Sequence, residues 1–288
     1  MNVLITGAGG QLATELDRTH SGNVCLHLLS IDDLDICDPI HVKRVVGDIR
    51  PDVIINTAAY TAVDKAEDEV ELAFEINEFG PRNVANAAQA FSSAMVHIST
   101  DFVFDGYATT PYLPTSPTAP LSIYGKSKLG GESSVREILG NNALIVRGGW
   151  LYSSHSSNFV LTMIRVMNSN SQITVVNDQV GTPTWTRRFA TGIWSMIENK
   201  VTGTQHWGNT GSASWYEFAE EIYRNAVDFG LVQSCDVCPV STSDYPTAAV
   251  RPAFSVLDHG ELQESIRKES EDWKVDLRSC MREIVDGF

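Results

Sequence analysis

The amino-acid sequence predicts an α/β fold, a doubly wound parallel sheet with a smaller C-terminal lobe. Two observations lead to this fold class. Short apolar runs alternate with helical patterns through the first half of the 288 residues, and a glycine-rich turn follows the first run. Such runs are typical of parallel strands that helices cover on both faces. The length allows one large domain and an added lobe.

The predicted strands of the sheet lie in the first 150 residues. They are Met1–Thr6, Val24–Ser30, Val53–Asn56, Met95–Ser99 and Leu144–Arg147, and the helices between them are Gln11–Thr19, Glu67–Ala90 with a break near Pro81, and Ser122–Leu139. Asp38-Pro39 has the pattern of an N-cap followed by proline at the first helical position. Strands that alternate with helices imply right-handed crossovers.

The alternation of strands and helices ends after Arg147. The second half is predicted to contain helices at Asn158–Asn168, Thr186–Glu198 and Trp215–Phe229, a strand at Ile173–Val176 and a helical tail from Glu261. We therefore predict a first domain over residues 1–150, with a return segment near 185–210, and a lobe over residues 151–288. The four prolines between Tyr107 and Pro120 exclude a helix or central strand and indicate a loop, either plain surface or a flap over a pocket.

Charge and composition exclude several classes of partner. The net charge is -15, from 21 Lys and Arg against 36 Asp and Glu, which argues against nucleic acid and anionic membranes. No apolar run is long enough to cross a bilayer, and the N-terminus lacks a signal-peptide pattern. The five cysteines form no disulfide framework and predict a cytoplasmic protein. Cys235 and Cys238 form a CxxC without a second pair, so we predict no metal there.

The first turn has the pattern of a dinucleotide-binding Rossmann sheet. Gly7 allows a tight turn, Gly10 allows close approach to a pyrophosphate, and Ala13 is small where the helix packs on the strand. The segment Asn56–Ala59 ends the third strand with small residues. An Asp after the second strand favours NAD and an Arg favours NADP, but neither signature is clean in Ser30–Asp33, so NADH and NADPH both stay open.

A candidate catalytic pair lies on the helix predicted at Ser122–Leu139. Tyr124 and Lys128 are spaced i,i+4 and share one helix face. A nearby ammonium favours phenolate, so we expect Lys128 to lower the pKa of Tyr124 and also to bind the nicotinamide ribose. Thr100 and Asp101 follow the strand Met95–Ser99, at the sheet edge where ligands bind. Thr100 is a candidate donor to a substrate carbonyl.

Taken together, these motifs resemble the extended short-chain dehydrogenase/reductases, and within them the group that reduces dTDP-4-dehydrorhamnose. The resemblance covers nearly the whole chain. It rests on Gly7–Ala13, Asn56–Glu67, Ser99–Gly106, Tyr124–Lys128, Asn158-Phe159, Asp178–Thr184 and Arg251-Pro252. It implies reduction by NADPH or NADH of the 4-keto group of a dTDP-linked 4-keto-6-deoxysugar, forming dTDP-L-rhamnose.

The resemblance also implies roles for individual residues. Thr100, Tyr124 and Lys128 are the expected catalytic residues. The expected coenzyme contacts are Gly7, Gly9, Gly10, Gln11, Leu12, Asp35, Ile36, Ala58, Ala59, Tyr60, Tyr124 and Lys128. The expected substrate contacts are Thr61, Val63, Thr100, Asp101, Trp150 and Arg251. Trp150 is otherwise a core residue, and Arg251 is otherwise part of a surface ion pair.

The sequence departs from the family pattern in several places. Pro114 and Ser116 stand where the family's flap usually carries acidic residues, and Phe254 follows Arg-Pro where polar residues are more usual. Some members bind Mg²⁺ at a dimer interface, and Glu15 matches one ligand position. Arg187 and Arg188 place basic residues nearby, so we predict no metal, and either a monomer or a homodimer.

Other functions remain open at this point. A 4,6-dehydratase needs an acidic pair after the threonine, whereas Asp101-Phe102 supplies only one acid. Another nucleotide-sugar enzyme such as a 4-epimerase is an alternative, and so is a non-catalytic regulatory subunit like that of methionine adenosyltransferase.

Overall fold

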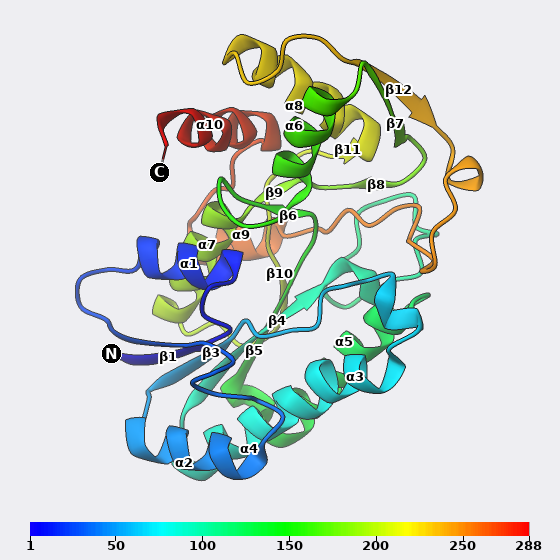
Figure 1. Cartoon of the computed structure of the whole chain (residues 1–288). Helices are drawn as coiled ribbons and strands as arrows, with labels where there is room; N and C mark the ends of the chain where they lie inside the picture. The colour runs from blue at the N-terminus through cyan, green and yellow to red at the C-terminus, as the bar shows by residue number, and fades with distance from the viewer. Residues whose placement is uncertain (288) are drawn as a thin grey trace.

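The computed structural model describes residues 1–287 and has a six-stranded parallel sheet at its centre (Figure 1). The strands are β1 (Asn2–Thr6), β2 (Cys25–Leu29), β3 (Val53–Asn56), β4 (Ala94–Thr100), β5 (Ala143–Gly148) and β10 (Gly203–His206). Their order in space is β2-β1-β3-β4-β5-β10, which confirms the predicted fold class. The order reverses between β1 and β3, and doubly wound sheets bind ligands beyond the strand ends at such a point.

Helices cover both faces of this sheet. On one face lie α1 (Gln11–Thr19) and α7 (Thr186–Glu198), and on the other lie α2 (Pro39–Ile49), α4 (Gly80–Phe91) and α5 (Ile123–Leu139) (Figure 1). Successive side chains of a strand point to opposite faces. In β1, Val3 and Ile5 pack under α1 and α7, and Leu4 packs under α2 and α4. Burial on both faces is the reason for the uninterrupted apolar runs.

Two helices begin where their capping residues require. The Asp38 carboxylate accepts hydrogen bonds from the backbone N–H groups of Ile40 (2.9 Å) and His41 (3.0 Å), and Pro39 is at the first helical position of α2. The Ser122 hydroxyl accepts from the N–H of Gly125 at 3.1 Å and caps α5. These side chains replace the backbone acceptors that a first helical turn lacks.

The helix predicted over Glu67–Ala90 is several short helices. It consists of the 3-10 helix η1 (Lys65–Glu67), α3 (Val70–Phe74), the π-turn η2 (Glu75–Phe79) and α4. Pro81 is in the first turn of α4, where its missing N–H breaks no hydrogen bond, so the irregularity precedes it. The π-turn directs Asn77 toward Tyr60, whose backbone N–H donates to the Asn77 side chain at 2.9 Å.

Most of the remaining elements form the C-terminal lobe. They are β6 (Leu151–Tyr152), α6 (Phe159–Ser169), β7 (Gln172–Val176), β8 (Val180–Gly181), β9 (Thr184–Trp185), β11 (Ala213–Ser214), α8 (Trp215–Asp228), β12 (Asp236–Val240), the 3-10 helix η5 (Thr242–Asp244) and α10 (Trp273–Asp286). Helix α9 (Gly260–Ile266) packs into the core of the sheet through Leu262 and Ile266, and the 3-10 helices η3 (Asp101–Val103) and η4 (Gly140–Asn142) belong to the first half. A second hydrophobic core centred on Phe218 lies among α6, α8 and α10. Phe288, the last residue of the predicted lobe, is outside the described residues.

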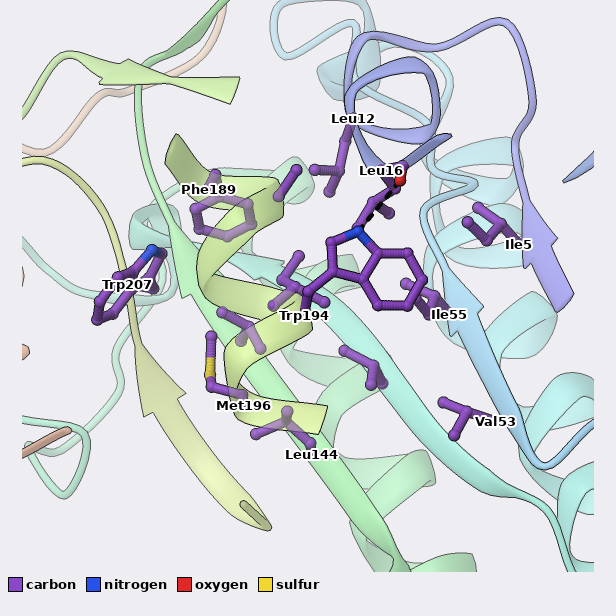
Figure 2. Packing of buried hydrophobic residues seen from close by; sticks show 14 of the residues in the cluster. Ile5, Leu12, Leu16, Val53, Ile55, Leu144, Phe189, Trp194, Met196 and Trp207 are labelled. Carbon is purple, nitrogen blue, oxygen red and sulfur yellow. Dashed lines mark hydrogen bonds between the residues drawn. The ribbon is translucent and has the colours of Figure 1, made fainter. Parts of the chain in front are cut away.

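The chain returns to the sheet between these lobe elements. Helix α7 packs on α1, and β10 adds a parallel strand beside β5. Figure 2 shows Trp194 of α7 between Leu16 and Ile55, with its indole N–H donating to the Leu16 carbonyl at 3.1 Å. A Cβ at Gly192 would collide with the Trp207 indole, so α7 depends on glycine there. No helix within residues 1–287 is long and apolar enough to span a membrane.

The contact of Trp194 with α1 gives a prediction of stability. Trp194→Phe keeps an aromatic ring but leaves the buried Leu16 carbonyl without its donor, so the free energy of unfolding should fall by about 1–3 kcal/mol. Trp185→Phe is the control, because the Trp185 indole nitrogen is buried without a partner among the described residues. Urea unfolding measures both variants. Equal losses in the two would contradict a specific role of the Trp194 hydrogen bond.

Candidate functional site

The glycine turn lies against the strand on the other side of the switch point. Gly7 has φ +75°, and a Cβ there would lie 2.8 Å from the backbone nitrogen of Ala58, which follows β3. Only glycine tolerates both the conformation and this approach. Gly10 precedes α1 and has no side chain to cap it, so the N–H groups of the first turn remain available to an anion.

A pocket of about 940 Å³ opens from this turn along the carboxyl edge of the sheet. Its volume suits a ligand of dinucleotide or drug size. Most of the candidate residues line it: Gly7, Gly10, Gln11, Leu12, Asp35, Ile36, Ala58, Ala59, Thr61, Val63, Thr100, Asp101, Tyr124, Lys128 and Trp150. Residues that are far apart in the sequence therefore converge on one site.

Three candidates are not among the lining residues that the described chain provides. Gly9 is in the turn with φ +87° and faces open space. The Tyr60 hydroxyl donates to the Glu69 carboxylate at 2.6 Å. Arg251 binds both carboxylate oxygens of Asp64, at 3.0 and 2.6 Å, which is the ion pair considered as its alternative.

The three candidate catalytic side chains meet where β4 ends and α5 begins. The Thr100 hydroxyl donates to the Asp101 carboxylate at 3.0 Å and also hydrogen-bonds Tyr124. The Tyr124 ring packs edge-on against Phe102, with ring centroids 5.5 Å apart. A Cβ on Gly125 would collide with the Phe102 carbonyl, so this glycine allows the first turn of α5 to approach the loop.

The expected lowering of the Tyr124 pKa is wrong in this structure. Burial raises the pKa of Tyr124 to about 12, and the nearby Asp101 carboxylate also raises it, against a smaller lowering by the Thr100 hydrogen bond. Burial penalises the charged form, and here it outweighs any effect of the neighbouring amine. Tyr124 therefore holds its proton at neutral pH.

Lys128 is buried among polar groups rather than solvated. Burial lowers its pKa to about 8, and the Glu132 carboxylate one helical turn further along opposes this shift. The ammonium donates to the Ile98 carbonyl of β4 at 2.6 Å. His97 of β4 also faces Lys128, but burial lowers the pKa of His97 well below its usual value and keeps it neutral.

A buried ion pair that the sequence analysis missed fixes this helix to the sheet. Arg147 of β5 binds both Glu132 oxygens, at 2.8 and 2.7 Å, and Ser99 of β4 donates to the same carboxylate at 2.6 Å. Arg147 also donates to the Pro114 carbonyl of the proline-rich loop at 3.3 Å. The signal in the sequence was an acidic residue i,i+4 from Lys128, and an arginine that ends an apolar strand.

Asp101 is a buried carboxylate at the floor of the pocket. Burial raises its pKa to about 6, and the side chains of Ser255 and Thr100, which hydrogen-bond the carboxylate, oppose this only in part. A Cβ on Gly149 would lie 2.7 Å from the carboxyl carbon, so glycine makes room for Asp101.

Glu15, the position that matches a metal ligand in some relatives, has cationic partners here. The Arg187 guanidinium binds it at 2.8 Å, His155 lies 2.9 Å from it, and Arg187 also contacts Glu283. The buried Glu15 carboxylate therefore receives its hydrogen bonds and its compensating charge from side chains of this protein. Ser153, in the same loop as His155, donates to Gln11 at 2.7 Å and ties this loop to the glycine turn.

The fold and the pocket together define a dinucleotide-binding protein of the extended short-chain dehydrogenase/reductase class. The chain belongs to the family described as the RmlD substrate binding domain, whose family model matches residues 1–285. The resemblance noted in the sequence is thereby confirmed.

Similar proteins cover almost the full length of the chain. The dTDP-4-dehydrorhamnose reductase of Burkholderia thailandensis is 35% identical over an alignment of 297 positions that covers 99% of each chain. A dTDP-4-dehydrorhamnose reductase structure from Clostridium acetobutylicum is 40% identical, with a TM-score of 0.93 over 98% of this chain and 99% of that one. The Bacillus anthracis enzyme of the same name, solved in complex with NADP, is also 40% identical, with a TM-score of 0.92 and the same coverage.

Glu132 should affect the activity through Lys128. Glu132→Gln keeps the side-chain volume and removes the charge that raises the Lys128 pKa. We expect the alkaline limb of the kcat/KM profile to move to lower pH and kcat to fall by about 10- to 100-fold as α5 shifts. Glu137→Gln, exposed on the same helix, is the charge-matched control. A profile that stays in place would contradict the electrostatic role.

The ionised Asp101 side chain should destabilise the folded protein at neutral pH. Its pKa in the folded protein is raised to about 6, so ionisation lowers the free energy of unfolding above that pH, and this destabilisation is absent below the usual pKa of 3.8. Asp101→Asn should therefore raise the free energy of unfolding at about pH 7.5 by on the order of 2–3 kcal/mol and have little effect near pH 3.5.

Asp105→Asn is the matched control for this measurement. A hydrogen bond from the Tyr112 hydroxyl lowers the Asp105 pKa, so its substitution should act in the opposite direction at neutral pH. Urea unfolding at several pH values tests both variants. A stabilisation by Asp101→Asn that is the same at every pH would refute the link to ionisation.

Proposed function

We propose that this protein uses NADPH or NADH to reduce the 4-keto group of a dTDP-linked 4-keto-6-deoxysugar, forming dTDP-L-rhamnose. The observation that carries the proposal is the convergence of Thr100, Tyr124 and Lys128 on the pocket that begins at the glycine turn. Relatives that match the whole chain are named dTDP-4-dehydrorhamnose reductases, which supports the same substrate class. An epimerase or a regulatory subunit is not favoured.

The coenzyme is assigned to the glycine turn and the strand ends beside it. The free N–H groups before α1 suit its pyrophosphate, and Ala58 and Ala59 leave space across the switch point. When bound, the reduced nicotinamide supplies the hydride that the carbonyl carbon accepts. We assign residues 1–150, with the return segment near 185–210, to coenzyme binding and residues 151–288 mainly to the substrate.

Tyr124 is assigned as the proton donor. With a pKa of about 12 the Tyr124 phenol stays protonated until an alkoxide forms. An alkoxide is a base of similar strength to hydroxide, whose conjugate acid, water, has a pKa of about 15.7, so it takes the proton from the phenol. The proton therefore moves from the Tyr124 oxygen to the C4 oxygen. Thr100 orients the phenol through their hydrogen bond. Lys128 has two ammonium protons beyond the one given to Ile98, and we assign these to the coenzyme ribose and to Tyr124.

The sugar and nucleotide are assigned to the lobe side of the pocket. Thr61, Val63, Asp101 and Trp150 line it there. Trp150 has φ +53° and stacks on Trp215 with ring centroids 3.5 Å apart, so an uncommon backbone conformation is held by packing. Arg251 is assigned to the diphosphate, and in that role it must exchange Asp64 for phosphate oxygens.

The compartment that we propose is the cytoplasm. All five cysteines are free thiols, which agrees with a reducing environment. Whether the chain acts as a monomer or a homodimer stays a prediction.

Incubation with the dTDP-4-keto-6-deoxysugar and NADH or NADPH tests the function. A reductase consumes one coenzyme per sugar, seen as loss of nicotinamide absorbance, and NMR identifies the 4-hydroxy product. Tyr124→Phe should lower kcat by at least about 100-fold while coenzyme affinity changes little, because only the acid is lost. Tyr245→Phe, an exposed tyrosine, is the control. No net coenzyme consumption would indicate an epimerase or a binding subunit, and an active Tyr124→Phe variant would refute the proton donor.

A further inference from the structure

The segment that follows β2 distinguishes NADH from NADPH in doubly wound folds. A residue about 20 positions beyond the glycine turn contacts the 2′ position of the adenosine ribose, as a hydroxyl in NADH or a phosphate in NADPH. Ser30 stands 20 positions after Gly10 and directly after β2, which ends at Leu29. Its neighbour Ile31 lines the pocket and is 68% exposed, so it is available to a ligand.

The hydrogen-bond donors of this segment are already in use. Ser30 donates to one oxygen of the Asp33 carboxylate twice, from its backbone N–H at 3.0 Å and from its hydroxyl at 2.7 Å. These hydrogen bonds lower the pKa of Asp33, which keeps it ionised at neutral pH. Ser30 and Asp33 flank Ile31, the residue of this turn that lines the pocket, so the turn carries a carboxylate where a phosphate site would offer free donors.

The ionisable side chains that line the surrounding pocket are mostly acidic, like Asp33. Among the lining residues that the described chain contributes, Lys128 is the one Lys or Arg, and it lies at the catalytic end beside Tyr124. Near Ile31 the lining consists of apolar side chains together with the carboxylates of Asp35 and Glu75. A 2′-phosphate adds up to about two negative charges. Phosphate sites usually provide Arg or Lys, and here the position after Ser30 is Ile31.

We propose that the Ser30–Asp33 turn and Ile31 make this protein selective for NADH over NADPH. The inference rests on the proposed function only in assuming that a nicotinamide dinucleotide binds at the glycine turn. A ribose 2′-hydroxyl can donate to the Asp33 carboxylate, whereas a 2′-phosphate places like charges together with no cation beside them. The NADP-bound relative from Bacillus anthracis is 40% identical, which leaves room for a different residue pattern after β2.

The test is equilibrium binding of each coenzyme to the full chain without sugar. Titration with NADH and with NADPH, followed by nicotinamide fluorescence, gives two dissociation constants that do not depend on turnover. NADH should bind more tightly by at least about tenfold, because like charges brought together in a site cost at least that factor. Added salt should narrow the difference.

Two variants locate the selectivity, and a third is the matched control. Asp33→Asn should tighten NADPH binding several-fold with little effect on NADH, and Ile31→Arg should tighten NADPH by roughly tenfold. Asp32 is the neighbour of Asp33, and its side chain is exposed and accepts no hydrogen bond from Ser30. Asp32→Asn removes the same charge as Asp33→Asn and should leave the ratio of the two dissociation constants nearly unchanged.

The possible results separate this inference from the proposed function. Equal affinities, or tighter NADPH binding, would overturn the selectivity while leaving a reductase intact. Equal effects of Asp32→Asn and Asp33→Asn would overturn the specific role of the turn. Binding of neither coenzyme would overturn both proposals.

Discussion

The ion pair between Arg147 and Glu132 is the interaction on which the site depends. It joins β5 to α5, and Ser99 extends it to β4, so three elements that carry or flank the candidate catalytic side chains share one buried carboxylate. Removing one partner of such a pair leaves an uncompensated buried charge, which typically costs about 3–5 kcal/mol. The position of α5 above the sheet is thus narrowly defined, and with it the positions of Tyr124 and Lys128.

Burial at this edge also determines the protonation states. It raises the pKa of Tyr124 and Asp101 and lowers the pKa of Lys128, so each group moves toward its neutral form. Glu132 counteracts the shift of Lys128 and helps it to keep a charge near neutral pH. The same carboxylate therefore has a mechanical role through Arg147 and an electrostatic role through Lys128. A reduction that ends in a neutral alcohol benefits from an acid that releases its proton only to a strong base.

The sequence predicted those features that depend on local pattern. Strands such as Val53–Asn56 and helices such as Gln11–Thr19 and Thr186–Glu198 have the predicted bounds, because the periodicity of their buried residues is visible within a few positions of the sequence. The grouping of Thr100, Tyr124 and Lys128 followed from the parallel sheet, whose strand ends share one edge. The direction of the Tyr124 shift was predicted wrongly because helix spacing reports the nearby amine but not the depth of the hydroxyl.

Ion pairs between residues far apart in the chain could not be predicted from the sequence. Arg251 contacts Asp64 across 187 positions, and Glu15 contacts Arg187 across 172. Neither separation has a local signature, since only the folded chain brings these groups together. The helix Glu67–Ala90 is a similar case, because the π-turn that orients Asn77 matters only beside Tyr60.

The acidic character of the molecule has a consequence for how an anionic ligand is held. The chain carries a net charge of -15, and two arginines near the site are paired, Arg251 with Asp64 and Arg187 with Glu15. Phosphate affinity must then come largely from neutral donors, above all the N–H groups ahead of α1, which act at short range. Such donors hold a pyrophosphate at one defined place and do not attract an additional phosphate elsewhere. The overall charge therefore favours ligands whose phosphates all lie where the backbone is arranged to receive them.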